Sequence, residues 1–206
     1  MDMLAPLVMA SGLGWASGLR LYAVLFLLGA AGYFDVIVLP PELAILAHPA
    51  VVLSAGLMCA IECGADKIPG FDSVWDTFQT FIRIPGGALL AAAAVADQST
   101  ALALAAAILG GSLAAGAHFT KAGGRLLINT SPEPFSNWSA SLTEDALVPI
   151  VVWLALAHPF VALGMLTLLV ALMAWLIPKL WRGVRQVMTA ARALTHTRRR
   201  TITDAA

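Results

Sequence analysis

Glu62-Cys-Gly-Ala-Asp-Lys-Ile-Pro-Gly-Phe-Asp-Ser-Val-Trp-Asp76 is the stretch around which the chain is organised. It contains four carboxylates and one lysine, whereas Pro49–Ala60 before it and Ala88–Ala96 after it carry no charge. Charged side chains are costly in hydrocarbon, so a stretch of this kind between apolar segments lies at a membrane surface or inside a protein. Its charged residues are Glu62, Asp66, Lys67, Asp72 and Asp76.

The composition of the chain is that of a membrane protein. Of 206 residues, 60% are hydrophobic and only 12% are charged, whereas soluble domains have about 25% charged residues. Several apolar runs approach the roughly 20 residues that cross a bilayer. We therefore expect an all-α, polytopic integral membrane bundle of about six transmembrane helices. The expected domains are a transmembrane domain, residues 1–182, and a basic cytoplasmic tail, residues 183–206.

Prolines, glycines and charged clusters divide the chain into its expected spans. Pro85-Gly86-Gly87 should break the third span between an amphipathic piece and an apolar piece, because proline cannot continue the helical hydrogen bonds. Lys121–Asp145 is expected to be a long polar connection, and Glu42–Ala47 a short interfacial helical turn. The expected spans are Leu4–Gly32, Pro49–Ala65, the discontinuous Ser73–Ala96, Thr100–His118, Ala146–Ala157 and Pro159–Trp181.

Basic residues gather on one side of this six-span arrangement. Eleven of the 12 Lys and Arg residues fall in or beside the two loops and the tail on that side, and Arg20 is the exception. Because short cytoplasmic loops carry the excess of Lys and Arg, the sequence predicts a multi-pass protein of the inner (plasma) membrane with both termini in the cytoplasm. The N-terminus lacks the basic start of a signal peptide, so its apolar segment is expected to stay as a span.

A short internal echo raises the hypothesis of an inverted repeat. Ser17-Gly-Leu-Arg-Leu21 is similar to Ala122-Gly-Gly-Arg-Leu126, and each motif follows a long apolar segment rich in glycine. Inverted repeats that contain broken helices occur in many transporters. A division into three plus three spans would make the second half of this chain inverted relative to the first.

Two polar motifs carry a resemblance to a known family. They are Glu62-x-x-x-Asp-Lys-Ile-Pro-x-x-Asp72 and Asn129-Thr-Ser-Pro-Glu-Pro-x-Ser-Asn137, and Ser17-Gly-Leu-Arg-Leu-Tyr22 fits a third segment. They resemble the signatures of an uncharacterised bacterial membrane family, domain of unknown function 4126. The resemblance extends to about Trp181 and implies a membrane protein in which these polar residues matter, but it implies no activity.

The acidic pair Glu62 and Asp66 is the first candidate for chemistry. The two residues are four positions apart and therefore share a helix face. Like charges near a medium of low dielectric constant resist joint ionisation, which suits proton or cation handling. Alternatively, Lys67 and Arg83 neutralise them in structural ion pairs. The candidate residues for binding a substrate or ion are Arg20, Glu62, Asp66, Lys67, Asp72, Asp76, Lys121 and Arg125.

The basic residues indicate anionic partners at the cytoplasmic face. Lys121 and Arg125 suit a lipid headgroup, or a phosphate or carboxylate of a substrate, with simple snorkelling as the alternative. The tail, with Arg198-Arg199-Arg200, suits anionic lipid rather than nucleic acid. The expected partners are thus the bilayer and its anionic headgroups, with a second copy or a partner membrane protein as a further option.

Metal and cofactor sites are not favoured. Cys59 and Cys63 share a helix face, where small residues let helices pack closely. Together with His118 and Glu62 they are numerous enough to ligate a metal, but their spacing does not require one. The chain has no phosphate-binding glycine loop with its lysine, no hydrolase serine elbow and no His-Glu-x-x-His motif. We therefore expect no cofactor, no metal and no enzymatic site, with an enzyme acting on lipid phosphate as the third hypothesis.

The leading hypothesis is a small transporter or channel for a solute or ion. Its pathway would be lined by Arg20, Glu62, Asp66, Lys67 and Arg125. The alternative is a non-transporting membrane subunit or assembly factor that structural ion pairs hold together.

Overall fold

The computed structural model describes residues 3–130 and 134–203, with side chains described through residue 189, and this part of the chain is all-α. The expected all-α class is confirmed. Proline and capping residues set several helix starts: Pro49 follows the cap His48, and the Ser99 hydroxyl accepts from the Leu102 N–H at 3.1 Å. The helices are α1 Leu4–Tyr33, η1 Pro41–Ala47, α2 Pro49–Ala65, α3 Phe71–Ala93, α4 Thr100–Ile128, α5 Pro134–Ala157 and α6 Pro159–Thr203.

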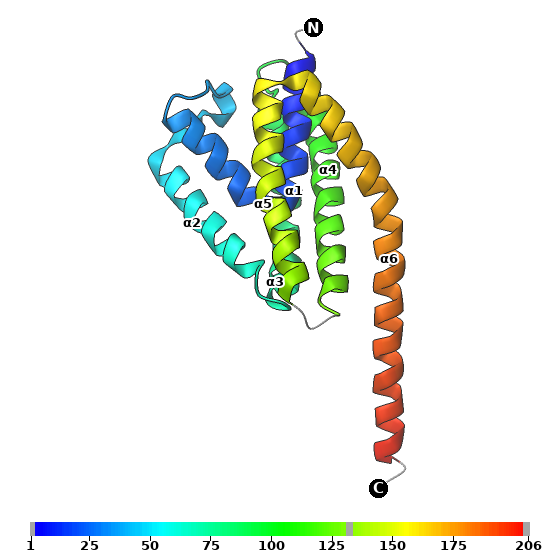
Figure 1. Ribbon diagram of the computed structural model, residues 1–206. Helices are drawn as coiled ribbons and strands as arrows, with labels where there is room; N and C mark the ends of the chain where they lie inside the picture. The colour runs from blue at the N-terminus through cyan, green and yellow to red at the C-terminus, as the bar shows by residue number, and fades with distance from the viewer. Residues whose placement is uncertain (1–2, 131–133, 204–206) are drawn as a thin grey trace.

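The first half of α1 lies at the centre of the bundle, against α3, α4 and α5 (Figure 1). Small residues let these backbones touch: a Cβ added to Gly14 would lie 2.6 Å from the Cα of Gly110, and one added to Gly87 would lie 2.6 Å from the Cβ of Ala114. Such close approach replaces the hydrophobic effect as the driving force for helix association in lipid. We call this contact of α1, α3 and α4 the small-residue layer.

Helix α1 is broken at Arg20, which has the non-helical dihedrals φ −147° and ψ 84°. Beyond the break the helix leaves the bundle and packs on η1 and α2, where Gly29 approaches Leu46 and Phe26 approaches Gly56 (Figure 1). The two halves diverge so that both outer ends of α1 point toward the same end of the molecule. The discontinuous helix therefore exists, but it is α1 rather than α3.

Helix α3 is continuous from Phe71 to Ala93, with Pro85 inside it. The expectation of a break at Pro85-Gly86-Gly87 was wrong. Proline removes one hydrogen bond of the helix, but a buried or lipid-facing backbone has no water with which to pair if the helix opens. The glycine that follows also has a packing role, because Gly87 belongs to the small-residue layer.

The expected polar connection Lys121–Asp145 is mostly helical. Helix α4 continues to Ile128, and α5 begins at Pro134 rather than at Ala146. The polar residues of this segment are buried against each other instead of facing water, as described below. The echo between Ser17–Leu21 and Ala122–Leu126 gains no support, because the first lies at the break of α1 and the second in the regular helix α4.

The number of membrane spans is smaller than expected. Four helices of the described chain are long and apolar enough to cross a membrane, and a fifth span arises if η1 and α2, bent by 72°, count as one. Helix α3, with its buried Asp72, Asp76, Gln79 and Arg83, is not in this set. Figure 1 places the start of α1 and the end of α6 at opposite ends of the molecule. The expected orientation of the chain in the membrane stays a prediction.

Apolar side chains cover the outer faces of the helices. Leu53 and Leu57 on α2, Leu104 on α4 and Leu168 on α6 are all more than 60% exposed. Large exposed apolar surface on several helices is the signature of lipid contact. The protein is therefore a helical membrane protein.

Candidate functional site

The buried faces of α3, α4 and α5 change character at one level of the bundle. Toward the α2–α3 and α4–α5 connections, the buried residues of these helices are charged or polar, whereas further along the same helices they are small or apolar. The polar set is Asp72, Asp76, Gln79 and Arg83 on α3, His118, Lys121 and Arg125 on α4, and Asn137, Ser141 and Glu144 on α5. The apolar set is Gly87, Leu90 and Ala91 on α3, Ala106, Gly110 and Ala114 on α4, and Val148, Val151, Val152 and Ala155 on α5.

A single network of charged side chains fills the polar half of the bundle. Its ion pairs connect side chains from α1, α2, α3, α4 and α5. The paired residues of different helices are far apart in the sequence. We call it the charged network. It comprises Arg20, Glu62, Asp66, Asp72, Asp76, Arg83, Lys121, Arg125, Glu144 and Asp145, with Lys67 at its edge.

Arg20 occupies the centre of this network at the break of α1. Its guanidinium lies 3.1 Å from Asp66 and 2.9 Å from Asp145, and donates to the Ser141 hydroxyl at 3.0 Å. The break leaves carbonyls without helical partners, and that of Leu19 accepts from Lys121 Nζ at 3.3 Å. A regular helix would satisfy the Leu19 carbonyl internally, so the break and the network support each other.

Arg83 links α2 and α3 at the end of the network nearest the small-residue layer. Its two terminal nitrogens donate to Glu62 at 2.6 Å and to Asp76 at 2.7 Å, and both carboxylates are buried. His118 lies 3.3 Å from Arg83 and 2.7 Å from the hydroxyl of Thr80. Two short charge-assisted hydrogen bonds to one guanidinium hold both carboxylates in place.

Lys121 and Asp66 form the closest pair of the network, at 2.5 Å. The same ammonium lies 3.1 Å from Glu144. Burial alone would raise the pKa of Asp66, which follows the last residue of α2, but Lys121 and Arg20 outweigh burial and hold this pKa below its ordinary value. Asp66 thus lies between two cations that favour its charged form.

Arg125 connects the network to residues beside the α4–α5 connection. It donates to the main-chain oxygens of Asp66 and Asn137, both at 2.9 Å, and lies 3.3 Å from Glu144. The Asn137 amide donates to Asn129 at 2.9 Å, and Asn129 donates to Asp72 at 2.7 Å. These amides belong to the second polar motif that the sequence singled out.

The structure brings all eight candidate residues of the sequence together. Seven of them are buried, and Lys67 is at the rim with 39% of its side chain exposed, 3.5 Å from Asp145. Their role in binding stays a prediction. The candidate set lacked Glu144 and Asp145, which fell in the segment expected to be a loop, and Arg83, which was considered only as a neutralising partner. Arg83 follows Asp76 by seven residues and so lies on the same face of α3, and this spacing could have identified it as a candidate.

Several carboxylates of the network have an oxygen that accepts no hydrogen bond from the part of the chain that the structure describes. One oxygen each of Glu62, Asp66 and Asp76 is buried without a hydrogen-bond partner among the described residues. No three His, Cys, Asp or Glu side chains of this part of the chain are gathered as metal ligands. Cys59 and Cys63 are free thiols, and Cys63 Sγ lies 3.4 Å from Arg20.

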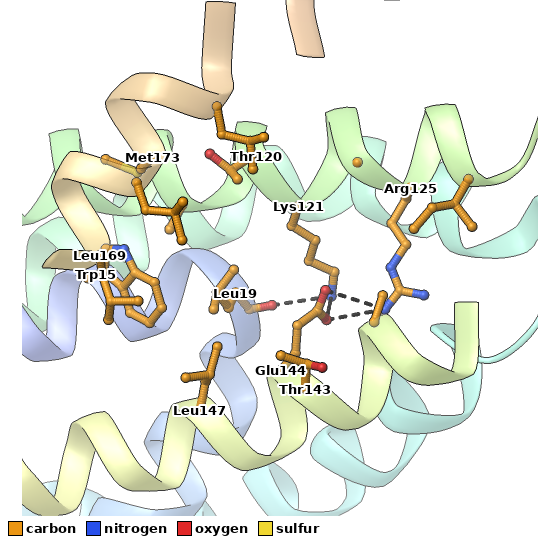
Figure 2. A pocket seen from close by; sticks show the side chains of 16 residues that line it. Trp15, Leu19, Thr120, Lys121, Arg125, Thr143, Glu144, Leu147, Leu169 and Met173 are labelled. Atoms are coloured by element: carbon orange, nitrogen blue, oxygen red, sulfur yellow. Dashed lines mark hydrogen bonds and ion pairs between the residues drawn. The ribbon is translucent and has the colours of Figure 1, made fainter. Parts of the chain in front are cut away.

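A cavity of about 320 Å³ reaches the network from the side of α5 and α6. Figure 2 shows Lys121, Glu144 and Arg125 at one end of it and Trp15, Leu147 and Leu169 at the other. Arg20 and Glu62 do not line this cavity. This cavity therefore reaches the network at Lys121, Arg125 and Glu144, and not at Arg20 or Glu62.

Comparison with known proteins yields one match. The family model described as Domain of unknown function (DUF4126) matches residues 7–179. No curated protein and no solved structure matches the chain.

Proposed function

The chain belongs to the family described as Domain of unknown function (DUF4126), and from the geometry of its charged network we propose that it is a small membrane transporter or channel for a small solute or ion. The observation that carries this proposal is the network itself: ten buried or half-buried charged groups fill one half of a bundle whose other half is apolar. The pathway would enter at Arg125 and Glu144 and reach Arg83 and Glu62.

The energetic cost of this network supports a function beyond stability. An ionised residue near the centre of a membrane helix costs about 2.5–3.5 kcal/mol on insertion scales. Replacing buried ion pairs by apolar residues is often neutral or stabilising, so packing alone gives no reason to keep so many. The unpaired oxygens of Glu62, Asp66 and Asp76 provide places where a proton or small cation can be held.

The broken helix supports transport as well. Non-helical backbone at membrane depth persists where it is buried in protein or lines a pathway, and transporters place their sites at such breaks. Here the break at Arg20 lies beside Asp66 and Lys121, next to the small-residue layer. Passage across the membrane then requires α1, α3 and α4 to separate in that layer.

We also propose an orientation. The end of the molecule with the α2–α3 and α4–α5 connections and the tail faces the cytoplasm, because the basic residues gather there. The N-terminal residues before Arg20 contain no Lys or Arg, so placing them on the opposite side, as Figure 1 suggests for a divided α1, obeys the same rule. Anionic headgroups would contact Lys179, Arg182 and Arg185 near the cytoplasmic end of α6.

A second candidate is a non-transporting subunit or assembly factor. The sealed environment of Arg20 and Glu62, each at most 1% exposed, favours it, because paired and inaccessible charges can serve as structural connections between helices. In this case the exposed apolar faces would bind another copy or a partner membrane protein. We place an enzymatic function last.

Flux per folded molecule separates the two candidates. Vesicles containing the protein and a pH-sensitive dye are given a potassium gradient with valinomycin, and proton flux is followed for wild type and Glu62→Gln. Glu42→Gln on the exposed face of η1 is the matched control, since it makes the same change outside the network. Transport predicts that Glu62→Gln abolishes a flux that Glu42→Gln retains. Equal flux per folded molecule in all three proteins, together with a lower melting temperature for Glu62→Gln, would defeat the transport proposal for this residue.

A further inference from the structure

The cavity between α1, α4, α5 and α6 has walls of two kinds. Its long wall is apolar and includes Leu147 of α5 and Leu169, Leu172 and Met173 of α6, whereas one end is closed by charged residues (Figure 2). A volume of about 320 Å³ is within the range of small-molecule sites, about 300–1,000 Å³. An apolar body joined to a polar group matches these walls.

At the charged end of the cavity, the lining residues include more cations than carboxylates. Two cations, Lys121 and Arg125, line it with one carboxylate, Glu144. All three side chains have partners in the network, so the cavity presents a site that is organised before anything binds. This end lies on the side of the bundle where the basic tail begins, at the leaflet in which anionic lipids concentrate.

Two residues of the wall carry buried hydrogen-bond donors that lack a partner in the described part of the chain. Trp15 Nε1 and Arg125 Nε are buried without a hydrogen-bond partner among the described residues, and both residues line the cavity. Trp15 is 5% exposed and Arg125 is 1% exposed. Both groups are N–H donors, and burying a donor unpaired costs about 1–3 kcal/mol. A ligand that completes this wall carries acceptor oxygens.

We propose that this cavity binds an anionic glycerophospholipid from the surrounding bilayer. Its phosphate lies against Arg125 and Lys121, an ester oxygen accepts from Trp15, and one acyl chain lies along Leu169, Leu172 and Met173. The phosphate and ester oxygens of such a lipid are acceptors, as the two free donors require, and the acyl chain fits the apolar wall. This site shares Arg125 and Glu144 with the entrance of the proposed pathway, but lipid binding there does not require that ions cross the protein.

Glycine positions allow the cavity to be filled without disturbing the fold. A Cβ added to Gly124, which lines the cavity, meets no atom within 4 Å. The same is true of Gly164, which lies on the exposed face of α6 outside the cavity. Gly124→Leu and Gly164→Leu are therefore a matched pair, and Ala140→Leu fills the cavity from α5 if Gly124→Leu does not fold.

Native mass spectrometry of the full-length protein in detergent provides the test. The protein is titrated with phosphatidylglycerol, with phosphatidylcholine of the same chains, and with oleate. We expect one phosphatidylglycerol to bind at least tenfold more tightly than phosphatidylcholine. Gly124→Leu or Ala140→Leu should weaken phosphatidylglycerol binding at least tenfold and Gly164→Leu should not, while Trp15→Phe should weaken it about fivefold.

Three results would overturn the proposal. Equal affinity for the two phospholipids would remove the anionic end from recognition, and unchanged binding in the folded cavity-filling variants would place the lipid elsewhere. Tighter binding of oleate would assign the cavity to a free fatty acid. Lipid binding is measured here without proton flux. A negative result would therefore overturn the lipid site and leave the transport proposal to be decided by the flux experiment.

Discussion

Lys121 Nζ on α4 donates to the carbonyl oxygen of Leu19, the residue before the break in α1, at 3.3 Å. The same ammonium forms the close pair with Asp66 of α2. One side chain thus satisfies the exposed end of a half-helix and neutralises a buried carboxylate from another helix. A cation at the C-terminal end of a helix is also favoured by the helix dipole.

Replacing Lys121 with methionine should strongly destabilise the protein. The change leaves Asp66 and the Leu19 carbonyl buried with fewer partners, and breaking a buried pair in this way costs about 3–5 kcal/mol. Denaturant unfolding in detergent measures the loss. Asp66→Asn removes the carboxylate charge that Lys121→Met leaves without its partner. The double variant should therefore recover part of the lost stability, with a coupling free energy of about 0.5–3 kcal/mol. Strictly additive single effects would show that the pair does not act as a unit.

The small-residue layer should not tolerate a larger residue at Gly14. A Cβ there would lie 2.6 Å from the backbone of Gly110, so Gly14→Ala should force α1 and α4 apart and cost about 1–3 kcal/mol. Gly64→Ala is the control, because an added Cβ at Gly64 meets nothing within 4 Å. Melting temperatures in detergent compare the two. Similar values would mean that α1 and α4 have more freedom at this contact than the structure indicates.

Replacing Pro85 with alanine should be tolerated or stabilising. Helix α3 continues through Pro85, which is exposed, so alanine restores the missing N–H without changing the path of the chain. Proline is about 3 kcal/mol less favourable than alanine inside a helix, and this sets the upper limit of the gain. Thermal unfolding measures it. A marked loss of stability would show that the proline itself is needed for the packing of α3.

The division of α1 predicts where introduced cysteines react. In a background with Cys59 and Cys63 replaced by alanine, cysteines at Met3 and Val38 should label from the same side of the membrane. A cysteine at Ile68, in the α2–α3 connection, should label from the other side. An impermeant maleimide on intact cells makes the distinction. Labelling of Met3 and Ile68 from one side would restore the arrangement with both termini together.

The sequence was sufficient where local chemistry marks a boundary. Helix α2 begins at Pro49 and ends at Ala65 as expected, and the turn at His158 is confirmed. It was insufficient for Lys121–Asp145, because Lys121 and Glu144 are buried by partners from distant parts of the chain. A polar stretch that pairs with other polar stretches cannot be distinguished locally from a loop in water.

The candidate site shows the same limit. The eight candidates meet in space because charged side chains in an apolar chain are costly in lipid and pair with one another inside the protein. This expectation requires no knowledge of the individual contacts. The break at Arg20 was not marked at its own position, since glycines precede it but none occupies it. Its cause is the set of partners from α2, α4 and α5 that holds the guanidinium and the freed carbonyl.

The change from polar to apolar packing along α3, α4 and α5 has an electrical consequence. Side chains that carry charge polarise in an applied field far more than packed glycine and alanine, so a voltage across the bilayer falls mainly over the small-residue layer and the apolar half above it. A unit charge crossing the full voltage gains or loses about 2.3 kcal/mol per 100 mV. We therefore expect most of that energy to be exchanged over the apolar half, where Gly14 contacts Gly110.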